Sequence, residues 1–248
     1  MDIILYNIIA CLASLILGYF FGSIPVGVIL CRLFRGEDPR DGGSKNSGGT
    51  NVGRLYGKKL GAATIILDAI KTVIPMILVW VLLNFVGIKQ VFADKLGGEM
   101  YANGYLVIML APIGATLGHC WPVFAGFKGG KAVASLTGFV FFTNWLMLVV
   151  GFLAFGITLK KSKYVSLSSM IGSFATTIVA WVLFVLQVTN TLNCGLFFWT
   201  FGLGEFWAMA DLWFALTSTL ITGMLIFRHR SNIRKLASGV ESKIKWMK

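Results

Sequence analysis

The first apolar segment of the chain is the feature that most restricts its fold. No residue from Ile3 to Cys31 is charged, and about 20 apolar residues are enough to cross the hydrocarbon core of a bilayer. The segment does not have the pattern of a cleavable signal peptide, because it begins after Asp2 and arginines follow it. Of the 248 residues, 56% are hydrophobic and only 13% are charged, too few to keep so much apolar surface in water. The sequence therefore predicts an all-α, polytopic integral membrane protein.

Apolar stretches predict seven membrane helices, two of them short. The short pair divides the stretch 132–159, which lies between two lysine clusters, and turns near Asn144 so that both clusters stay on one side. Because basic residues favour the cytoplasmic side, we expect the N-terminus outside and the C-terminus in the cytoplasm. We expect one membrane-embedded domain over residues 1–248. The predicted spans are 3–31, 60–87, 102–118, 132–143, 145–159, 165–188 and 206–227.

Cysteine and histidine usage indicates neither a metal centre nor a disulfide framework. The sequence has four cysteines, far apart and without a CxxC pair, and only two histidines. Tetrahedral metal sites need clusters of such ligands at suitable spacing. We therefore expect no metal ion and no cofactor.

Residues 36–54 form the first of three polar clusters, all of them expected at the cytoplasmic side. Glycines in this loop, among them Gly43 and Gly48, permit positive φ and close backbone approach, so the loop is suited to hold an anion. Neutral donors surround these glycines, and Arg54 is suited to bind a phosphate in a bidentate way. The alternative is a flexible polar turn. The candidate donors are Ser44, Asn46, Thr50 and Asn51.

The second cluster, residues 119–132, leads into a predicted short helix. Gly129 and Gly130 lie where this helix is expected to begin, and helix N-termini favour anions. Lys128 and Lys131 add positive charge. The alternative is an interfacial loop anchored by aromatic residues with snorkelling lysines. His119 by itself is typical of a hydrogen-bonded structural histidine.

The third cluster, residues 228–241, follows the last predicted span. In a helix, His229 and Asn232 would lie three residues apart on one face. The alternative, a basic tail at the membrane surface, accounts for the neighbouring lysines and arginines but not for these two residues. Within the predicted second span, Asp68 and Lys71 have the spacing of a structural ion pair.

Several motifs in order along the chain resemble those of the bacterial acyl-phosphate:glycerol-3-phosphate acyltransferases of the PlsY type. The similarity covers nearly the whole chain, and the Asp68-x-x-Lys71 pair also fits the family pattern. The motifs are Gly22-Ser-Ile-Pro25, Asp38-x-Arg-x-x-Gly-Ser-x-Asn-x-Gly-x-Thr-Asn-x-x-Arg54, Gly118-His-x-x-Pro-x-Phe-x-x-Phe-Lys-Gly-Gly-Lys131, Ser166-Leu167 and Arg228-His-Arg-x-Asn-Ile-x-x-Leu236.

The resemblance implies transfer of a fatty acyl group from acyl phosphate to the sn-1 hydroxyl of glycerol 3-phosphate, with lysophosphatidate and phosphate as products. It also implies the bacterial cell membrane as location, an active site at the cytoplasmic face and the acyl-phosphate synthase as a possible partner. An acyl phosphate is already activated, so the enzyme needs orientation and charge stabilisation more than a strong nucleophile.

On this hypothesis the catalytic residues are Ser44, Arg54, Lys131, His229 and Asn232. The substrate-binding residues are Gly43, Asn46, Gly48, Thr50, Asn51, His119, Lys128, Gly129, Gly130 and Glu241.

The sequence differs from the family pattern at three positions, and two other functions remain as alternatives. Lys45 and Ala132 stand where the family has glycine, and Gly49 stands where it has alanine. If Lys45 requires positive φ, it carries backbone strain, although it also offers a phosphate contact. The proton acceptor is either His229 or a substrate phosphate oxygen. The rival functions are a transporter of an anionic phosphorylated metabolite, which usually has internal repeats, and a non-catalytic scaffold.

Overall fold

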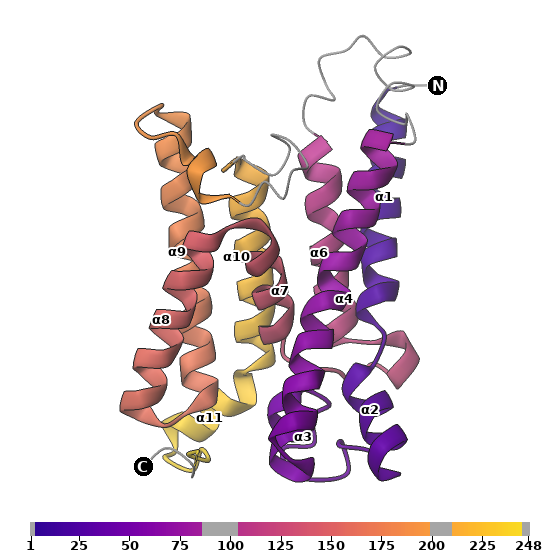
Figure 1. The fold of residues 1–248 in the computed structure, drawn as a ribbon, viewed down its shortest axis with the longest axis vertical. Coiled ribbons are helices and arrows are strands. Elements are labelled where there is room, and N and C mark those ends of the chain that lie inside the picture. The colour runs from indigo at the N-terminus through magenta and orange to yellow at the C-terminus, as the bar shows by residue number, and fades with distance from the viewer. Residues whose placement is uncertain (1–2, 86–103, 199–209, 245–248) are drawn as a thin grey trace. The chain divides into compact units, whose positions relative to one another are not determined.

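A computed structural model describes residues 3–85, 104–198 and 210–244 (Figure 1). Its contacts divide the chain into two compact units, residues 1–130 and 131–248, and each unit is described by itself. The described residues are helical apart from loops and one isolated β-bridge between Asn144 and Phe198. This confirms the predicted all-α class, whereas the single domain stays a prediction.

Three long helices form the first unit: α1 (Ile3–Gly22), α4 (Lys58–Phe85) and α6 (Gly104–Cys120). They lie side by side, with the short helices α2 (Val26–Arg35) and α3 (Gly49–Tyr56) near one end (Figure 1). A Cβ atom at Gly18 would collide with the carbonyl of Ala111, and one at Gly114 with the carbonyl of Leu15. Glycine at these positions therefore lets the backbones of α1 and α6 approach closely, a common device between apolar helices.

The first predicted span is one candidate membrane span in the structure, Asn7–Arg35, but it consists of two helices with a break between them. α1 ends at Gly22 and α2 begins at Val26, after Pro25. Proline lacks the N–H that helix continuation requires, and the Nζ of Lys71 donates a hydrogen bond to the carbonyl of Ile24 at 2.8 Å. Lys71 therefore satisfies a backbone acceptor at the break.

The second unit contains α7 (Val133–Thr143), α8 (Trp145–Ser162), α9 (Val165–Val188), α10 (Leu212–Arg228) and α11 (Arg230–Ala237). The predicted turn at Asn144 is confirmed, because its side chain accepts a hydrogen bond from the N–H of Met147 at 2.9 Å and caps α8. α8 is longer than predicted and ends at Ser162. Of the predicted last span, residues 206–209 lie outside the described part of the chain, as do residues 86–87 and 102–103 of two others.

Five helices or helix pairs among the described residues are long and apolar enough to cross a membrane. A sixth candidate is the pair α10 and α11, which is bent by 56°. α7 has only 11 residues, about 17 Å at 1.5 Å per residue, and is too short to cross alone. The structure therefore supports a multi-pass membrane protein, while the count of seven spans and their orientation stay predictions.

Candidate functional site

The loop between α2 and α3 is organised around the side chain of Asn51, which is only 2% exposed. Its Nδ2 donates to the carbonyls of Pro39 at 2.7 Å and Asn46 at 2.9 Å, and its Oδ1 accepts from the N–H of Ser44 at 2.8 Å. One buried amide thus connects three points of a loop that has no regular structure of its own. The substrate contact predicted for Asn51 stays a prediction, and these bonds give the residue a role in shaping the loop.

The same loop uses several of its backbone N–H groups internally. Besides the N–H of Ser44, the N–H of Lys45 donates to the carbonyl of Gly42 at 2.9 Å, and that of Gly48 donates to Asn46 Oδ1 at 2.8 Å. These groups fix the loop. The side chains of Ser44, Lys45, Thr50 and Arg54 are exposed. Thr50 and Arg54 are four residues apart in α3 and therefore lie on the same face, so this face presents donors suited to a phosphate.

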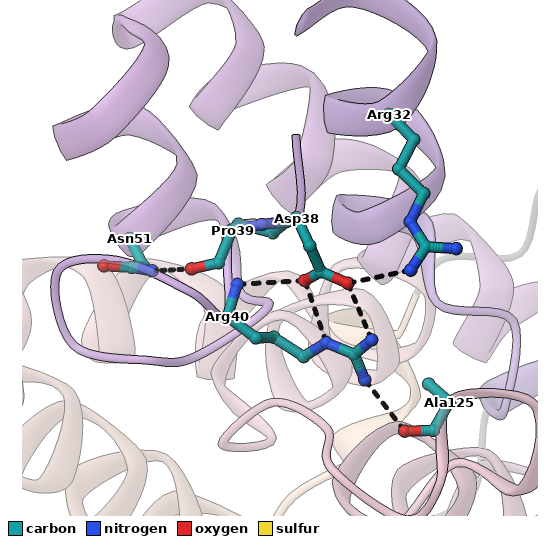
Figure 2. A network of polar contacts seen from close by, with 6 residues as sticks. All are labelled: Arg32, Asp38, Pro39, Arg40, Asn51 and Ala125. Atoms are coloured by element: carbon teal, nitrogen blue, oxygen red, sulfur yellow. Dashed lines mark hydrogen bonds and ion pairs between the residues drawn. The ribbon is translucent and has the colours of Figure 1, made fainter. Parts of the chain in front are cut away.

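A second network joins Asp38 and Arg40 (Figure 2). The guanidinium of Arg40 donates to both carboxylate oxygens of Asp38, at 2.9 and 2.7 Å, and its remaining nitrogen donates to the carbonyl of Ala125 at 2.8 Å. These bonds from Arg40 lower the pKa of Asp38 to about 2. A lowered pKa stabilises the folded state at neutral pH, and the contribution is lost only as the pH falls through that value. The pair is therefore charged throughout the physiological range.

The second cluster packs on His119, which is 6% exposed. The N–H of Gly130 donates to the carbonyl of His119 at 2.9 Å. A Cβ atom at Gly130 would collide with the imidazole, and one at Gly129 with the carbonyl of His119.

His119 Nδ1 lies 3.5 Å from Asp68, which pairs with Lys71 at 2.7 Å. The predicted structural ion pair is confirmed, and the two glycines are needed for close packing. The helix start predicted at Gly129 and Gly130 was wrong: α7 begins only at Val133, three residues after Gly130, because Ala132 in the left-handed conformation precedes the helix.

In the second unit, Lys131 and the third cluster meet in a chain of polar contacts. Lys131 Nζ donates to Asn232 Oδ1 at 2.6 Å, and Asn232 Nδ2 donates to Glu241 Oε1 at 2.7 Å. Ser166 Oγ donates to the same Glu241 oxygen at 2.7 Å. Both ends of the Asn232 amide are engaged, which fixes its orientation. Hydrogen bonds that span 9 to 101 positions of the chain thus connect the Lys131 ammonium, through Asn232, to Glu241 and Ser166.

His229 lies at the bend between α10 and α11 and is 3% exposed. Its Nδ1 is 2.8 Å from the carbonyl of Leu225. A carbonyl oxygen only accepts hydrogen bonds, so Nδ1 carries a proton, and in the neutral imidazole the lone pair is then on Nε2. The helix is bent here, so His229 and Asn232 do not share one straight helical face as the sequence predicted. The imidazole is nevertheless held in the tautomer suited to accept a proton at Nε2.

The structure thus brings many of the predicted residues together within each unit. In the first unit the loop 36–48 contacts the segment 121–130, and in the second unit Lys131 contacts Asn232. Convergence of all three clusters at one face of the membrane stays a prediction. The sequence interpretation assigned no role to Asp38, Arg40 or Ser166, although the family-like motifs contain all three and were the available signal.

Two departures from the family pattern coincide with unusual backbone conformations. Lys45 has φ of 53° and Ala132 has φ of 63°, both in the left-handed region that favours glycine. The strain expected for Lys45 is confirmed. Lys45 is exposed, so its substitution removes little packing.

We expect Lys45→Gly to stabilise the protein by about 0.5–1 kcal/mol. Glycine removes the strain of the left-handed conformation, and this gain is partly offset because glycine has more conformational freedom to lose on folding. The Tm of the detergent-purified protein should rise by about 1–4 °C. Lys59→Gly is the control, because Lys59 is exposed within α4 and the same change there should lower Tm. A lower Tm for both variants would contradict the strain at Lys45.

Comparisons with known proteins find relatives that match nearly the whole chain. A family model described as glycerol-3-phosphate acyltransferase matches residues 12–239. A glycerol-3-phosphate acyltransferase of Rhodopseudomonas palustris (strain HaA2) is 37% identical over 94% of this chain and 95% of its own. One of Listeria monocytogenes (serotype 4a, strain HCC23) is 33% identical over 94% of this chain and 96% of its own.

Solved structures show the same similarity. The crystal structure of PlsY (YgiH), an integral membrane glycerol 3-phosphate acyltransferase, in its glycerol 3-phosphate form has a TM-score of 0.68 with 28% identity. The match covers 95% of this chain and 96% of that one. The lysophosphatidic acid form of PlsY gives a TM-score of 0.65 with 27% identity, over 95% of each chain.

Proposed function

The chain belongs to the glycerol-3-phosphate acyltransferase family, and from this premise we propose that it acylates the sn-1 hydroxyl of glycerol 3-phosphate with acyl phosphate as donor. The hydroxyl oxygen attacks the acyl carbonyl, the bond from the carbonyl carbon to the phosphate oxygen breaks, and the hydroxyl proton is removed. The products are 1-acyl-glycerol 3-phosphate and inorganic phosphate. The family assignment does not favour the transporter alternative.

One observation carries the proposal: the family match spans residues 12–239, and the polar motifs within it are ordered by long-range hydrogen bonds. Such bonds tie the loop 36–48 to the segment 121–130 and tie Lys131 to Asn232. The related PlsY was crystallised in a glycerol 3-phosphate form and a lysophosphatidic acid form. Substrate and product of the proposed reaction therefore correspond to the ligands of a structural relative.

In the first unit we assign phosphate binding to the loop and to the segment that contacts it. Ser44, Thr50 and Arg54 are exposed donors around the loop, and Arg54 supplies a forked guanidinium suited to phosphate. Gly43, Asn46, Gly48 and Asn51 give the loop its shape. Lys128 and the backbone of Gly129 bind a second phosphate on this proposal. Gly130, whose N–H donates to the carbonyl of His119, lets this segment pack closely on the imidazole.

In the second unit we assign charge stabilisation and proton removal. Lys131 neutralises the departing phosphate. Asn232 accepts a hydrogen bond from its ammonium group, and Glu241 in turn holds the Asn232 amide. His229 accepts the hydroxyl proton at Nε2, because its Nδ1 proton faces the carbonyl of Leu225. A substrate phosphate oxygen is the alternative acceptor.

We further propose that the enzyme lies in the bacterial cell membrane as one domain, with the N-terminus outside and the active site at the cytoplasmic face. The basic loops and the basic tail support this orientation through the preference of Lys and Arg for the inner side. The acyl-phosphate synthase is the partner we propose, because acyl phosphate is unstable in water and its apolar chain favours direct delivery to the membrane.

The test of donor and acceptor is a direct assay. The purified protein receives palmitoyl phosphate with labelled glycerol 3-phosphate, and a parallel sample receives palmitoyl-CoA. We expect labelled lysophosphatidate from the first sample alone. Product only from the palmitoyl-CoA sample would overturn the donor assignment, and product from neither sample would overturn the enzymatic function. Flux of labelled glycerol 3-phosphate into proteoliposomes without a donor would instead support the transporter.

A further inference from the structure

Arg40 makes contacts in two segments of the first unit that are far apart in sequence. Its Nε and Nη2 bind the carboxylate of Asp38, whereas its Nη1 donates to the carbonyl of Ala125, 85 residues away (Figure 2). The side chains of Arg40 and Asp38 are 21% and 12% exposed. The contact is thus largely shielded from water, where charge-assisted hydrogen bonds are strongest.

The geometry of this contact suits arginine specifically. A planar guanidinium offers five donors in a fixed fork, so two of them engage one carboxylate while a third points away to another acceptor. Asp38 also accepts from the N–H of Arg40 at 3.0 Å, which fixes the carboxylate relative to the backbone from which the guanidinium extends. A lysine ammonium at this position would reach the carboxylate or the carbonyl, but its single nitrogen does not reproduce the fork.

The two segments that Arg40 joins are the ones to which we assign phosphate binding. A second contact, from Asn46 Nδ2 to the carbonyl of Gly129 at 3.2 Å, connects them at another point. Inside the loop, Asn51 fixes the positions of Pro39 and Ser44. A displacement of Arg40 is therefore transmitted to the loop as a whole.

We propose that Arg40, held by Asp38, is a positioning residue that sets the spacing between the loop carrying Ser44 and the segment 128–130. This inference rests on the proposed function for its effect on turnover, but the physical connection between the two segments is tested without it. Arg40 contacts no reacting atom on this proposal. It acts by keeping two phosphate-binding segments at a fixed separation.

The experiment uses the full-length protein in detergent or nanodiscs with three variants. Arg40→Ala removes both contacts, and Arg40→Lys keeps the charge without the fork. Arg32→Ala is the matched control. Arg32 also contacts Asp38, at 3.1 Å, but its side chain is 64% exposed, and this contact joins α2 to the loop and not the loop to the segment 121–130. Amide hydrogen exchange of residues 121–130, Tm and steady-state kinetics are measured for each variant.

We expect exchange at 121–130 to rise in Arg40→Ala and to stay at the wild-type level in Arg32→Ala. For Arg40→Ala, kcat/KM should fall about 10–100-fold, the loss typical of slightly misplaced binding groups, with Arg40→Lys in between. Unchanged exchange at 121–130 in Arg40→Ala would overturn the inference, whatever its activity. Inactive wild-type protein would instead overturn the proposed function and leave the exchange result as an independent test of the connection.

Chemical rescue separates positioning from a general loss of structure. Methylguanidinium added to Arg40→Ala should restore part of kcat/KM, because Asp38 remains to bind it. The double variant Asp38→Ala/Arg40→Ala lacks this carboxylate and should show no rescue. Equal rescue of both variants, or rescue of neither, would contradict the role assigned to the ion pair.

Discussion

Replacement of Lys71 by methionine should destabilise the protein by about 3–5 kcal/mol, because it leaves the buried carboxylate of Asp68 without its main counter-charge. The Nζ of Lys71 lies 2.7 Å from Asp68, and the two side chains are only 7% and 4% exposed. The same ammonium donates to the carbonyl of Ile24, so the variant also loses the donor at the break between α1 and α2. His119, 3.5 Å from Asp68, remains as a weaker partner.

The matched variant is Asp68→Asn/Lys71→Met, which removes both charges. Because a buried carboxylate without a partner is the main cost, the double variant should recover a large part of the stability lost by Lys71→Met. Thermal unfolding in detergent is the measurement, and the single variant should lower Tm by about 6–20 °C. If the double variant is no more stable than the single one, the loss comes from the contact with Ile24 and not from the unpaired charge.

Features of the fold that depend on local sequence were predictable. Hydropathy located the long helices because about 20 apolar residues suffice to cross a bilayer. The turn at Asn144 was predictable because lysine clusters flank the stretch 132–159, and Asn144 then caps α8 as asparagine commonly does. The strain at Lys45 was also predictable, because a residue in place of a glycine has to adopt the conformation that the glycine had.

Features that depend on contacts between distant residues were not predictable in the same way. The break after Gly22 carries a local signal, Pro25, but the apolar run continues through it, and hydropathy does not register a missing N–H. Nothing in the local sequence indicates that Arg40 reaches Ala125 or that Lys131 reaches Asn232, because each bond spans 85 or more positions. Motifs identified these residues as candidates, and only the tertiary structure shows which of them contact each other.

His229 is the residue whose replacement should reduce turnover most specifically. It is 3% exposed, and its Nδ1 is bound to the carbonyl of Leu225, so the ring is fixed with the lone pair on Nε2. A positioned imidazole of this kind contributes about 10²–10⁴-fold to a reaction that requires proton removal. The alternative acceptor, a substrate phosphate oxygen, would retain its function in a protein without the imidazole.

We therefore expect His229→Ala to lower kcat by about 10²–10⁴-fold while Tm changes much less, with palmitoyl phosphate and glycerol 3-phosphate as substrates. Arg230→Ala is the control: Arg230 is the next residue and is exposed, with its guanidinium 4.6 Å from the Phe227 ring centroid, so its loss should leave kcat near the wild-type value. Added imidazole should restore part of the activity of His229→Ala. A fall in kcat of less than about tenfold, with no rescue by imidazole, would assign proton removal to a substrate phosphate oxygen, since general base catalysis by a side chain contributes more than that.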